Sequence, residues 1–261
     1  MTSFTLKIIA IVSMFCDHFG DALIGHFSFF NLIGRIAFPI FAFQISEGYL
    51  HTKNLKKYFL RLGIFAVISQ IPFSLFSYKY LGASPLSLNV FFTLFIGLLA
   101  IHLWNKGDGA FVSNLKQEGH TYSSKKETVH LTDSTTPTLD HKRTSFYISR
   151  ILGIVVVLLL AYLANVLNTD YGFWGVIVIF AFYLFKDKKA VMLTSFVVLC
   201  IIRYGLDIIN YGFNYAYVLL CIFTAIAAIF IGLYNGKQGK KIKYLLYFFY
   251  PVHLLLLYFI F

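Results

Sequence analysis

Charged residues are scarce in this sequence, since only 13% of its 261 residues are Asp, Glu, Lys or Arg, whereas 59% are hydrophobic. A soluble domain of this length needs a polar surface, and so few charged side chains cannot supply one. The mean hydropathy of +0.75 agrees with this conclusion. The composition therefore excludes an ordinary soluble domain and indicates an integral membrane protein.

Familiar catalytic and redox motifs are also absent. The cysteines Cys16, Cys200 and Cys221 lie in separate apolar segments without a CxxC pair, which is typical of packing residues. The sequence contains no HExxH, GxSxG or Walker A motif. The bulky Phe15 before Cys16 is unlike a signal-peptide cleavage site, so we expect the first apolar run to be retained. Any chemistry must therefore use histidines and carboxylates within the membrane.

Apolar runs of about 20 residues cross a bilayer, and without period-2 alternation they must be helical to satisfy their own backbone. We therefore predict an all-α, polytopic membrane helix bundle with about nine transmembrane helices. The runs are 4–24, 28–49, 59–78, 86–104, 146–168, 171–185, 190–207, 215–235 and 243–261.

The 22 Lys and Arg residues outnumber the 11 Asp and Glu residues and give a net charge of +11. Nearly all of them lie at the start of the first run, between the second and third, around the polar central segment, after the sixth, and before the ninth. With nine crossings these places share one side, which the positive-inside rule identifies as cytoplasmic. We therefore predict a cytoplasmic N-terminus, an external C-terminus and no nucleic-acid partner.

The only long polar stretch, 105–145, divides the chain into membrane parts 1–104 and 146–261. It has too few apolar residues to offset the entropy of ordering, so we expect a disordered cytoplasmic loop. Its histidines, His120, His130 and His141, fit no standard ligand spacing, and no metal site is expected.

The segment 14–25, "MFCDHFGDALIG", places Asp17, His18 and Asp21 inside an apolar run, and Arg35 lies at a similar depth in the next run. Each such charge costs at least about 2.5–3.5 kcal/mol in a bilayer and needs a partner or a function. We predict one polar pocket in the outer half of the bundle, with Arg35 pairing with Asp17 or Asp21. Because residues three apart share a helical face, Asp21 is expected to orient the His18 ring and Asp17 to face another helix. The structural alternative is a buried ion pair that only fixes helix register.

Other polar residues of the membrane segments allow two interpretations each. Glu47 either pairs with Lys53 or Arg61, or lines an inner opening that attracts a phosphate-bearing cofactor. Arg203, four residues before Asp207, forms either an interfacial salt bridge or a substrate contact.

Several segments together resemble the TraX family, named for the conjugative-plasmid protein that acetylates F pilin. The family is similar to a wider group of membrane acyltransferases that includes O-antigen acetylases and the lysosomal heparan glucosaminide N-acetyltransferase. The segments are "LKIIAIVSMFCDHFG" (6–20), "IGRIAFPIFAFQISEGY" (33–49), "KKYFLRLGIFAVISQIPF" (56–73), "LNVFFTLFIGL" (88–98), "DYGFWGV" (170–176) and "YPVHLLLL" (250–257).

The resemblance implies a multi-pass acetyltransferase of the bacterial cytoplasmic membrane. Acetyl-CoA, or another acyl-CoA, would be the donor, and the acceptor would be an amine or hydroxyl of a protein, peptide or glycan. His18 would be the catalytic histidine that removes the acceptor proton. Arg35 would orient the site or bind an anion, and Asp17 or Asp21 would steady the imidazole.

Binding residues are expected in the same family segments. Asn89, Asp170 and His253, the last in the YPxH pattern, are candidates for substrate or cofactor contacts, together with Glu47 and Arg203. Membrane lipids are the other expected partners. Two further hypotheses stay open, a transporter or proton-coupled permease that uses the same charges as a relay, and a non-enzymatic assembly partner.

Overall fold

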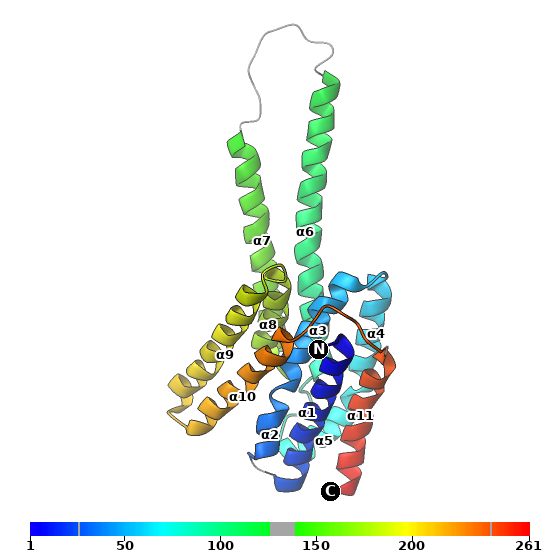
Figure 1. Ribbon diagram of the computed structural model, residues 1–261, viewed down its shortest axis with the longest axis vertical. Helices are drawn as coiled ribbons and strands as arrows, with labels where there is room; N and C mark the ends of the chain where they lie inside the picture. Colours follow the sequence, from blue (N-terminus) through cyan, green and yellow to red (C-terminus); the bar gives the residue numbers. More distant parts are fainter. Residues whose placement is uncertain (26, 126–138, 241) are drawn as a thin grey trace.

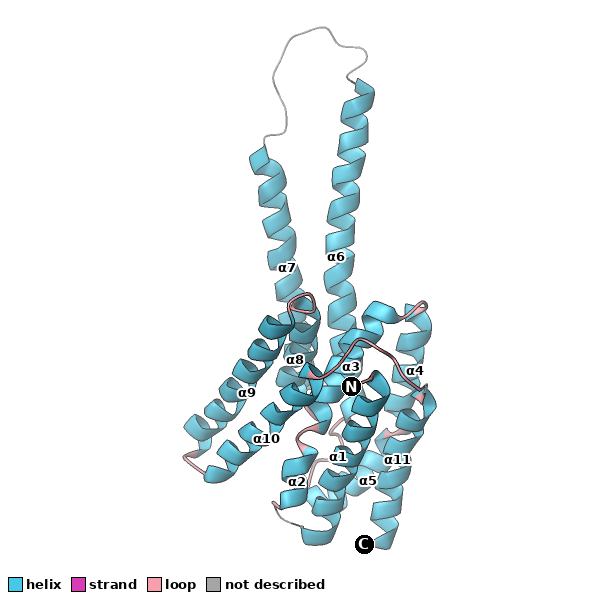
Figure 2. Cartoon of the chain, in the orientation of Figure 1, coloured by secondary structure: helices cyan, strands magenta, loops and turns pink. Residues whose placement is uncertain are grey.

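The computed structural model describes the backbone of all residues except 26, 126–138 and 241, and the side chains of these except 108–125, 139–146 and 243. Every regular element of the described residues is a helix, as Figure 2 shows. The helices are α1 (Ser3–Ile24), α2 (Phe29–Gly34), α3 (Ala37–His51), α4 (Leu55–Ile68), α5 (Gln70–Leu81), α6 (Val90–Lys125), α7 (Leu139–Val166), α8 (Gly172–Leu184), α9 (Lys189–Tyr211), α10 (Tyr215–Gly232) and α11 (Lys243–Ile260).

The all-α prediction is confirmed, but the count of about nine transmembrane helices is not. In the described residues, five spans are long and apolar enough to cross a membrane, or six if the bent pair α4 and α5 is one span. Helices α8 and α11 are apolar but shorter, and α1 is not among the candidate spans. The assignment of the cytoplasmic side stays a prediction.

Helices α6 and α7 extend well beyond the bundle, as Figure 1 shows. Helix α6 continues to Lys125 and α7 begins at Leu139, so helix occupies much of the segment expected to be a disordered loop. Polar residues such as Lys, Gln and Glu are good helix formers, which is why composition alone placed the helix ends too early. Residues 126–138 and the side chains of the three loop histidines lie outside the described residues.

The second predicted run is broken into α2 and α3 at Arg35 and Ile36. Pro39 lies in the first turn of α3 and has no N–H to donate to the carbonyl of Arg35, four residues earlier. The break therefore places an arginine inside a span whose most apolar window is 67% buried. Of the candidate spans, Phe29–His51 has the most buried apolar window, so a polar group there meets mostly protein rather than lipid.

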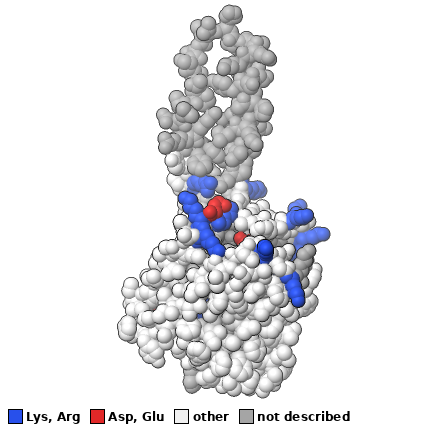
Figure 3. All heavy atoms as spheres, in the orientation of Figure 1, with Lys and Arg blue, Asp and Glu red and all other residues white. Residues whose placement is uncertain are grey.

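The opposite situation holds for α7, α9 and α10, whose most apolar windows are each only 17% buried. Their apolar side chains face outward, as lipid-contacting helices require. The lower body in Figure 3 shows almost no charged side chains on this face, whereas Lys and Arg gather as a band at the end where α6 and α7 leave the bundle.

The two termini lie toward opposite ends of the bundle in Figure 1. The chain start is tied to the loop between α10 and α11, because Ser3 N–H donates to the Lys237 carbonyl at 2.9 Å and Phe4 N–H to the Gln238 carbonyl at 3.0 Å. These contacts place the beginning of α1 beside the beginning of α11. The two helices then run side by side away from the end of the bundle where Lys and Arg gather.

Candidate functional site

Helices α1 and α2 form a tight hairpin that carries the predicted polar pocket. Helix α1 ends at Gly25, whose φ of 68° is readily adopted only by a residue without a side chain. At the start of α2, the N–H and hydroxyl of Ser28 both donate to Asn31 Oδ1, at 2.9 and 2.7 Å. A Cβ added at Gly20 would lie only 2.7 Å from Ser28 Oγ. The close approach of the two helices therefore depends on glycine.

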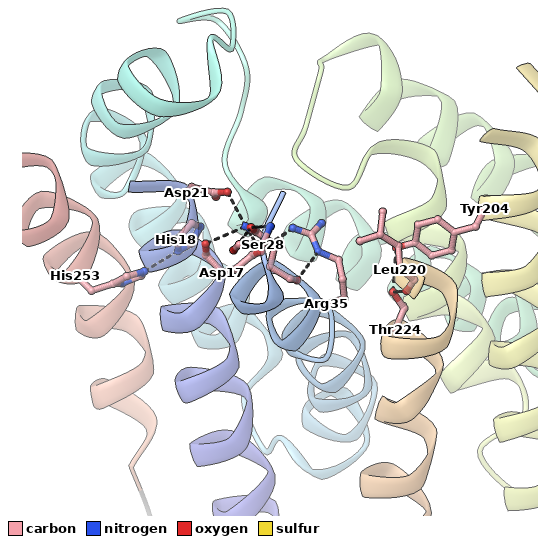
Figure 4. A network of polar contacts seen from close by, with 10 residues as sticks. Asp17, His18, Asp21, Ser28, Arg35, Tyr204, Leu220, Thr224 and His253 are labelled. Carbon is pink, nitrogen blue, oxygen red and sulfur yellow. Dashed lines mark hydrogen bonds and ion pairs between the residues drawn. The ribbon is translucent and has the colours of Figure 1, made fainter. Parts of the chain in front are cut away.

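Asp17 and Arg35 form an ion pair across this hairpin, shown in Figure 4. Arg35 Nη2 lies 2.7 and 2.9 Å from the two carboxylate oxygens of Asp17. The buried Asn31 amide donates to Asp17 Oδ1 at 3.2 Å and to Asp21 Oδ1 at 2.6 Å. Asp17 faces another helix, as predicted, and of the two predicted partners of Arg35 it is Asp17 rather than Asp21 that forms the ion pair. Asn31 joins both carboxylates into one network.

Gly34 makes this ion pair sterically possible, because a Cβ at this position would overlap the Asp17 side chain. We expect Gly34→Ala to destabilise the protein by about 1–3 kcal/mol, as overpacking does, and to displace Asp17 from Arg35. Thermal unfolding in detergent measures the loss. Gly205→Ala is the matched control, since an added Cβ there meets nothing within 4 Å. That variant should be as stable as the wild type or slightly more stable, because alanine favours helix. Equal stability of the two variants would contradict the close-packing argument.

His18 pairs with another histidine rather than with Asp21. His18 Nδ1 lies 2.8 Å from His253 Nε2 on α11, although 235 positions separate the two residues in sequence. The prediction that Asp21 orients the His18 ring is therefore wrong in this structure, where the Asp21 carboxylate accepts from Asn31 instead. Three-residue spacing places two side chains on one helical face, but partners on neighbouring helices decide which contact forms.

The hydrogen-bond pattern assigns the tautomers of the two neutral rings. His253 Nδ1 lies 2.7 Å from the Phe249 carbonyl, which can only accept, so Nδ1 carries the proton. His253 Nε2 then accepts, and His18 Nδ1 must donate to it. The remaining nitrogen, His18 Nε2, keeps a free lone pair. His18 is only half-buried, so this arrangement suits a general base that a substrate can reach.

Further polar groups surround Arg35. Asp170, at the loop before α8, interacts electrostatically with Arg35, Asp17 and Asp21. The three carboxylates Asp17, Asp21 and Asp170 around Arg35 are called the carboxylate cluster below. Tyr204 of α9 also interacts electrostatically with Arg35, and its hydroxyl lies 2.9 Å from Thr224 Oγ1 (Figure 4). The structure thus brings the predicted residue Asp170 to the pocket.

Asn89 and Arg203 lie apart from this pocket. The Asn89 amide donates to the Ala66 carbonyl at 2.8 Å and to Gln70 Oε1 at 2.9 Å, where α4 and α5 meet at an angle of 43°. These contacts favour a structural role for Asn89. Arg203 pairs with Asp207 at 3.5 Å on its own helix, as the salt-bridge interpretation expected. Within the described residues, no hydrogen bond or ion pair joins them to the carboxylate cluster.

A cavity of about 860 Å³ opens at the basic end of the bundle and is called the basic cavity. Glu47 lines it, in agreement with the inner-opening interpretation, and lies 3.8 Å from His51 rather than beside Lys53 or Arg61. Burial, then the Glu47 carboxylate, raises the pKa of Tyr234 to about 12, so this phenol stays protonated. The other charged side chains of the wall are Lys7, Lys53, Arg61 and Lys240.

Sequence reasoning missed Asn31, Tyr250 and the pairing of the two histidines. Asn31 is a polar residue in the apolar run "FSFFNLIGRI", and the cost of an amide at that depth could have identified it. Tyr250 begins the YPxH pattern and was overlooked because tyrosine is common in membrane segments. No local pattern could have paired His18 with His253.

Comparisons with known proteins identify the family of this chain. A family model described as TraX protein matches residues 3–117 and 127–261. The chain is similar to a probable fimbrial assembly protein FimC, serogroup H1, from Dichelobacter nodosus, at 33% identity over 110 residues. This match covers 38% of the chain and only 45% of the length of that relative. No solved structure matches. Since the family match extends over both membrane parts, the chain belongs to the TraX family.

Proposed function

We propose that this protein is a membrane acyltransferase that transfers an acetyl group from acetyl-CoA to an amine or hydroxyl of an acceptor. The observation that carries the proposal is the His18–His253 pair, which leaves a basic nitrogen free at a half-buried position. The acceptor loses its N–H or O–H proton to His18 Nε2 as its lone pair attacks the thioester carbonyl carbon. The C–S bond then breaks, and the CoA thiolate leaves and takes up a proton. His18 thus serves as the general base.

The basic cavity is proposed to hold the phosphates of CoA at the cytoplasmic face of a bacterial cytoplasmic membrane. Four cationic side chains line it against one carboxylate, which suits a polyanionic ligand. Arg61 Nε is buried without a hydrogen-bond partner among the described residues and can donate to a phosphate.

The basic cavity and His18 are joined by shared helices. Lys7 lines the cavity and His18 follows on the same helix, about 16 Å further along its axis at 1.5 Å per residue. The thioester of CoA lies at the end of a long flexible arm, so phosphates at the basic end and an acetyl group at His18 are compatible.

The direct test is transfer from labelled acetyl-CoA by the full chain in lipid nanodiscs, followed as free CoA release and as acetylation of added amines. We expect turnover that saturates with acetyl-CoA. A protein that neither turns over nor binds acetyl-CoA would refute the proposal.

Arg61→Gln tests the phosphate site. Because hydrogen bonds to charged groups contribute about 1.5–3 kcal/mol, the KM for acetyl-CoA should rise about 10-fold or more, with kcat within about 2-fold of the wild type. Lys79→Gln is the matched control, since Lys79 Nζ donates to the Tyr258 carbonyl at 3.0 Å near the C-terminal end of α11. An unchanged KM in Arg61→Gln would remove Arg61 from the donor site.

A second candidate function follows from the name of the fimbrial relative. We infer that an assembly role without group transfer is the best alternative, in which the chain would bind a protein of fimbrial assembly. In that case a partner should be captured equally well by the wild type and by a His18 variant, and no acetyl group should appear on it. If the acetyltransferase proposal holds, the same partner becomes the candidate acceptor and gains an acetyl group only with the wild type.

A further inference from the structure

Tyr250 holds a buried hydroxyl group that donates to no protein group among the described residues. The residue is 2% exposed, and its phenol oxygen interacts with the backbone of Val90 at the start of α6, but its O–H has no acceptor. Buried hydroxyl groups in native proteins are nearly always hydrogen-bonded, so an exception needs an explanation. A substrate that completes the hydrogen bond is one such explanation.

Tyr250 lies between His18 and the wall of the basic cavity. Its ring packs edge-on against the His18 ring, with 6.2 Å between the centroids. On another side it contacts the Phe91 ring at 5.2 Å, and Phe91 is part of the wall of the basic cavity. Tyr250 also interacts electrostatically with Asp170 and Tyr171, which themselves interact with Arg35. Tyr250 therefore lies where the cavity, His18 and the carboxylate cluster meet.

Several other donors of this region already bind protein groups. The Arg35 guanidinium binds Asp17, and the Asn31 amide binds Asp17 and Asp21. His18 Nδ1 donates to His253. The Tyr250 hydroxyl is a donor next to His18 that can bind a new oxygen without breaking an existing hydrogen bond.

We propose that the Tyr250 hydroxyl is the catalytic donor to the thioester carbonyl oxygen, an inference that rests on the proposed acyltransferase function. When the acceptor attacks the carbonyl carbon, the C=O electron pair moves to oxygen and His18 Nε2 takes the acceptor proton. Tyr250 donates its hydrogen bond to this oxyanion without losing its own proton. The carbonyl re-forms as the C–S bond breaks and the electron pair leaves with sulfur. A donor fixed before the reaction stabilises this charge better than mobile water does.

Tyr250→Phe tests the proposal because it removes one oxygen and keeps the ring that packs on His18 and Phe91. Loss of one oxyanion donor lowers kcat by about 10²-fold, whereas the KM for acetyl-CoA should stay within about 2-fold of the wild type. The variant should unfold close to the wild-type temperature or above it, because the O–H donates to no protein group that the variant would leave unpaired. Lower activity with equal or higher stability distinguishes a catalytic hydroxyl from a structural one.

Tyr80→Phe is the matched control, since Tyr80 lies on the neighbouring helix α5 and its hydroxyl donates to the Leu257 carbonyl of α11 at 3.4 Å. This variant should keep wild-type kcat. Normal kcat in Tyr250→Phe, or a loss that accompanies a lower unfolding temperature, would overturn the role of Tyr250 while leaving the acyltransferase function intact. A wild-type protein without acetyl-CoA turnover would overturn both proposals.

Discussion

Replacing His18 with glutamine is expected to lower the rate of acetyl transfer by about 10³-fold, in the middle of the range that general base catalysis contributes. Glutamine has no basic nitrogen and cannot accept the acceptor proton. Its amide can still donate to His253 Nε2, the contact that His18 Nδ1 makes in the wild type. The variant should therefore fold and bind acetyl-CoA but transfer the acetyl group much more slowly. Single-turnover transfer in nanodiscs, measured beside acetyl-CoA binding, separates the two effects.

His102→Gln is the control for this experiment. His102 is a half-buried membrane histidine on α6 whose ring contacts Phe59 at 5.8 Å, away from the His18–His253 pair. It should transfer acetyl groups at the wild-type rate. If His18→Gln binds acetyl-CoA and turns over normally, His18 is not the general base, and its free Nε2 has no role in catalysis.

The pairing of Arg35 with an aspartate of the first apolar run, Asp17 or Asp21, was accessible from the sequence for a physical reason. Unpaired charges are so costly in a bilayer that an arginine and an aspartate at similar depth on consecutive segments have few other choices. Arg203 and Asp207, four residues apart, form the salt bridge that was one of the two interpretations of this pair. Charge pairing within the first two membrane segments needed no knowledge of the remaining fold.

Contacts between distant helices were not accessible. Asp21 has the right spacing to reach His18, yet it binds Asn31, because a closer donor on α2 satisfies the carboxylate. The partner of His18 comes from α11, and nothing in the local pattern of either helix specifies that the two meet. Spacing defines the face of a helix, whereas packing of the whole bundle decides what that face touches.

The predicted count of about nine membrane spans is not confirmed for a related reason. Hydropathy locates apolar runs, and each predicted run does contain helix, but Pro39 and Pro72 interrupt two of them and α8 is only 13 residues long. Short or broken helices are compatible with a membrane protein where other helices cover their ends. The break between α2 and α3 at Arg35 is one of these interruptions. It makes the number of spans harder to predict, and it also positions Arg35 for its ion pair with Asp17.

Arg35→Gln is expected to cost about 3 kcal/mol in the free energy of unfolding, and Asp17→Asn about 1–2 kcal/mol. The side chains of Arg35 and Asp17 are 29% and 14% exposed, so the loss should be at the low end for a buried pair. The asymmetry arises because Arg35 is the cation that faces the carboxylate cluster. Its removal leaves three mutually repelling carboxylates, whereas removal of Asp17 leaves Arg35 beside two others.

The double variant Asp17→Asn/Arg35→Gln decides whether direct pairing is the cause. If the two side chains stabilise the fold through each other, the double variant should be at least about 1 kcal/mol more stable than the sum of the single effects predicts. Arg203→Gln, which breaks an ion pair whose arginine is 51% exposed, should change stability by no more than about 0.5 kcal/mol. Denaturation in mixed micelles measures the four variants and the wild type under one condition. Strict additivity of the two single effects would mean that Asp17 and Arg35 act on the fold independently, and the short distance between them would then reflect packing of α1 on α2 rather than an energetic pair.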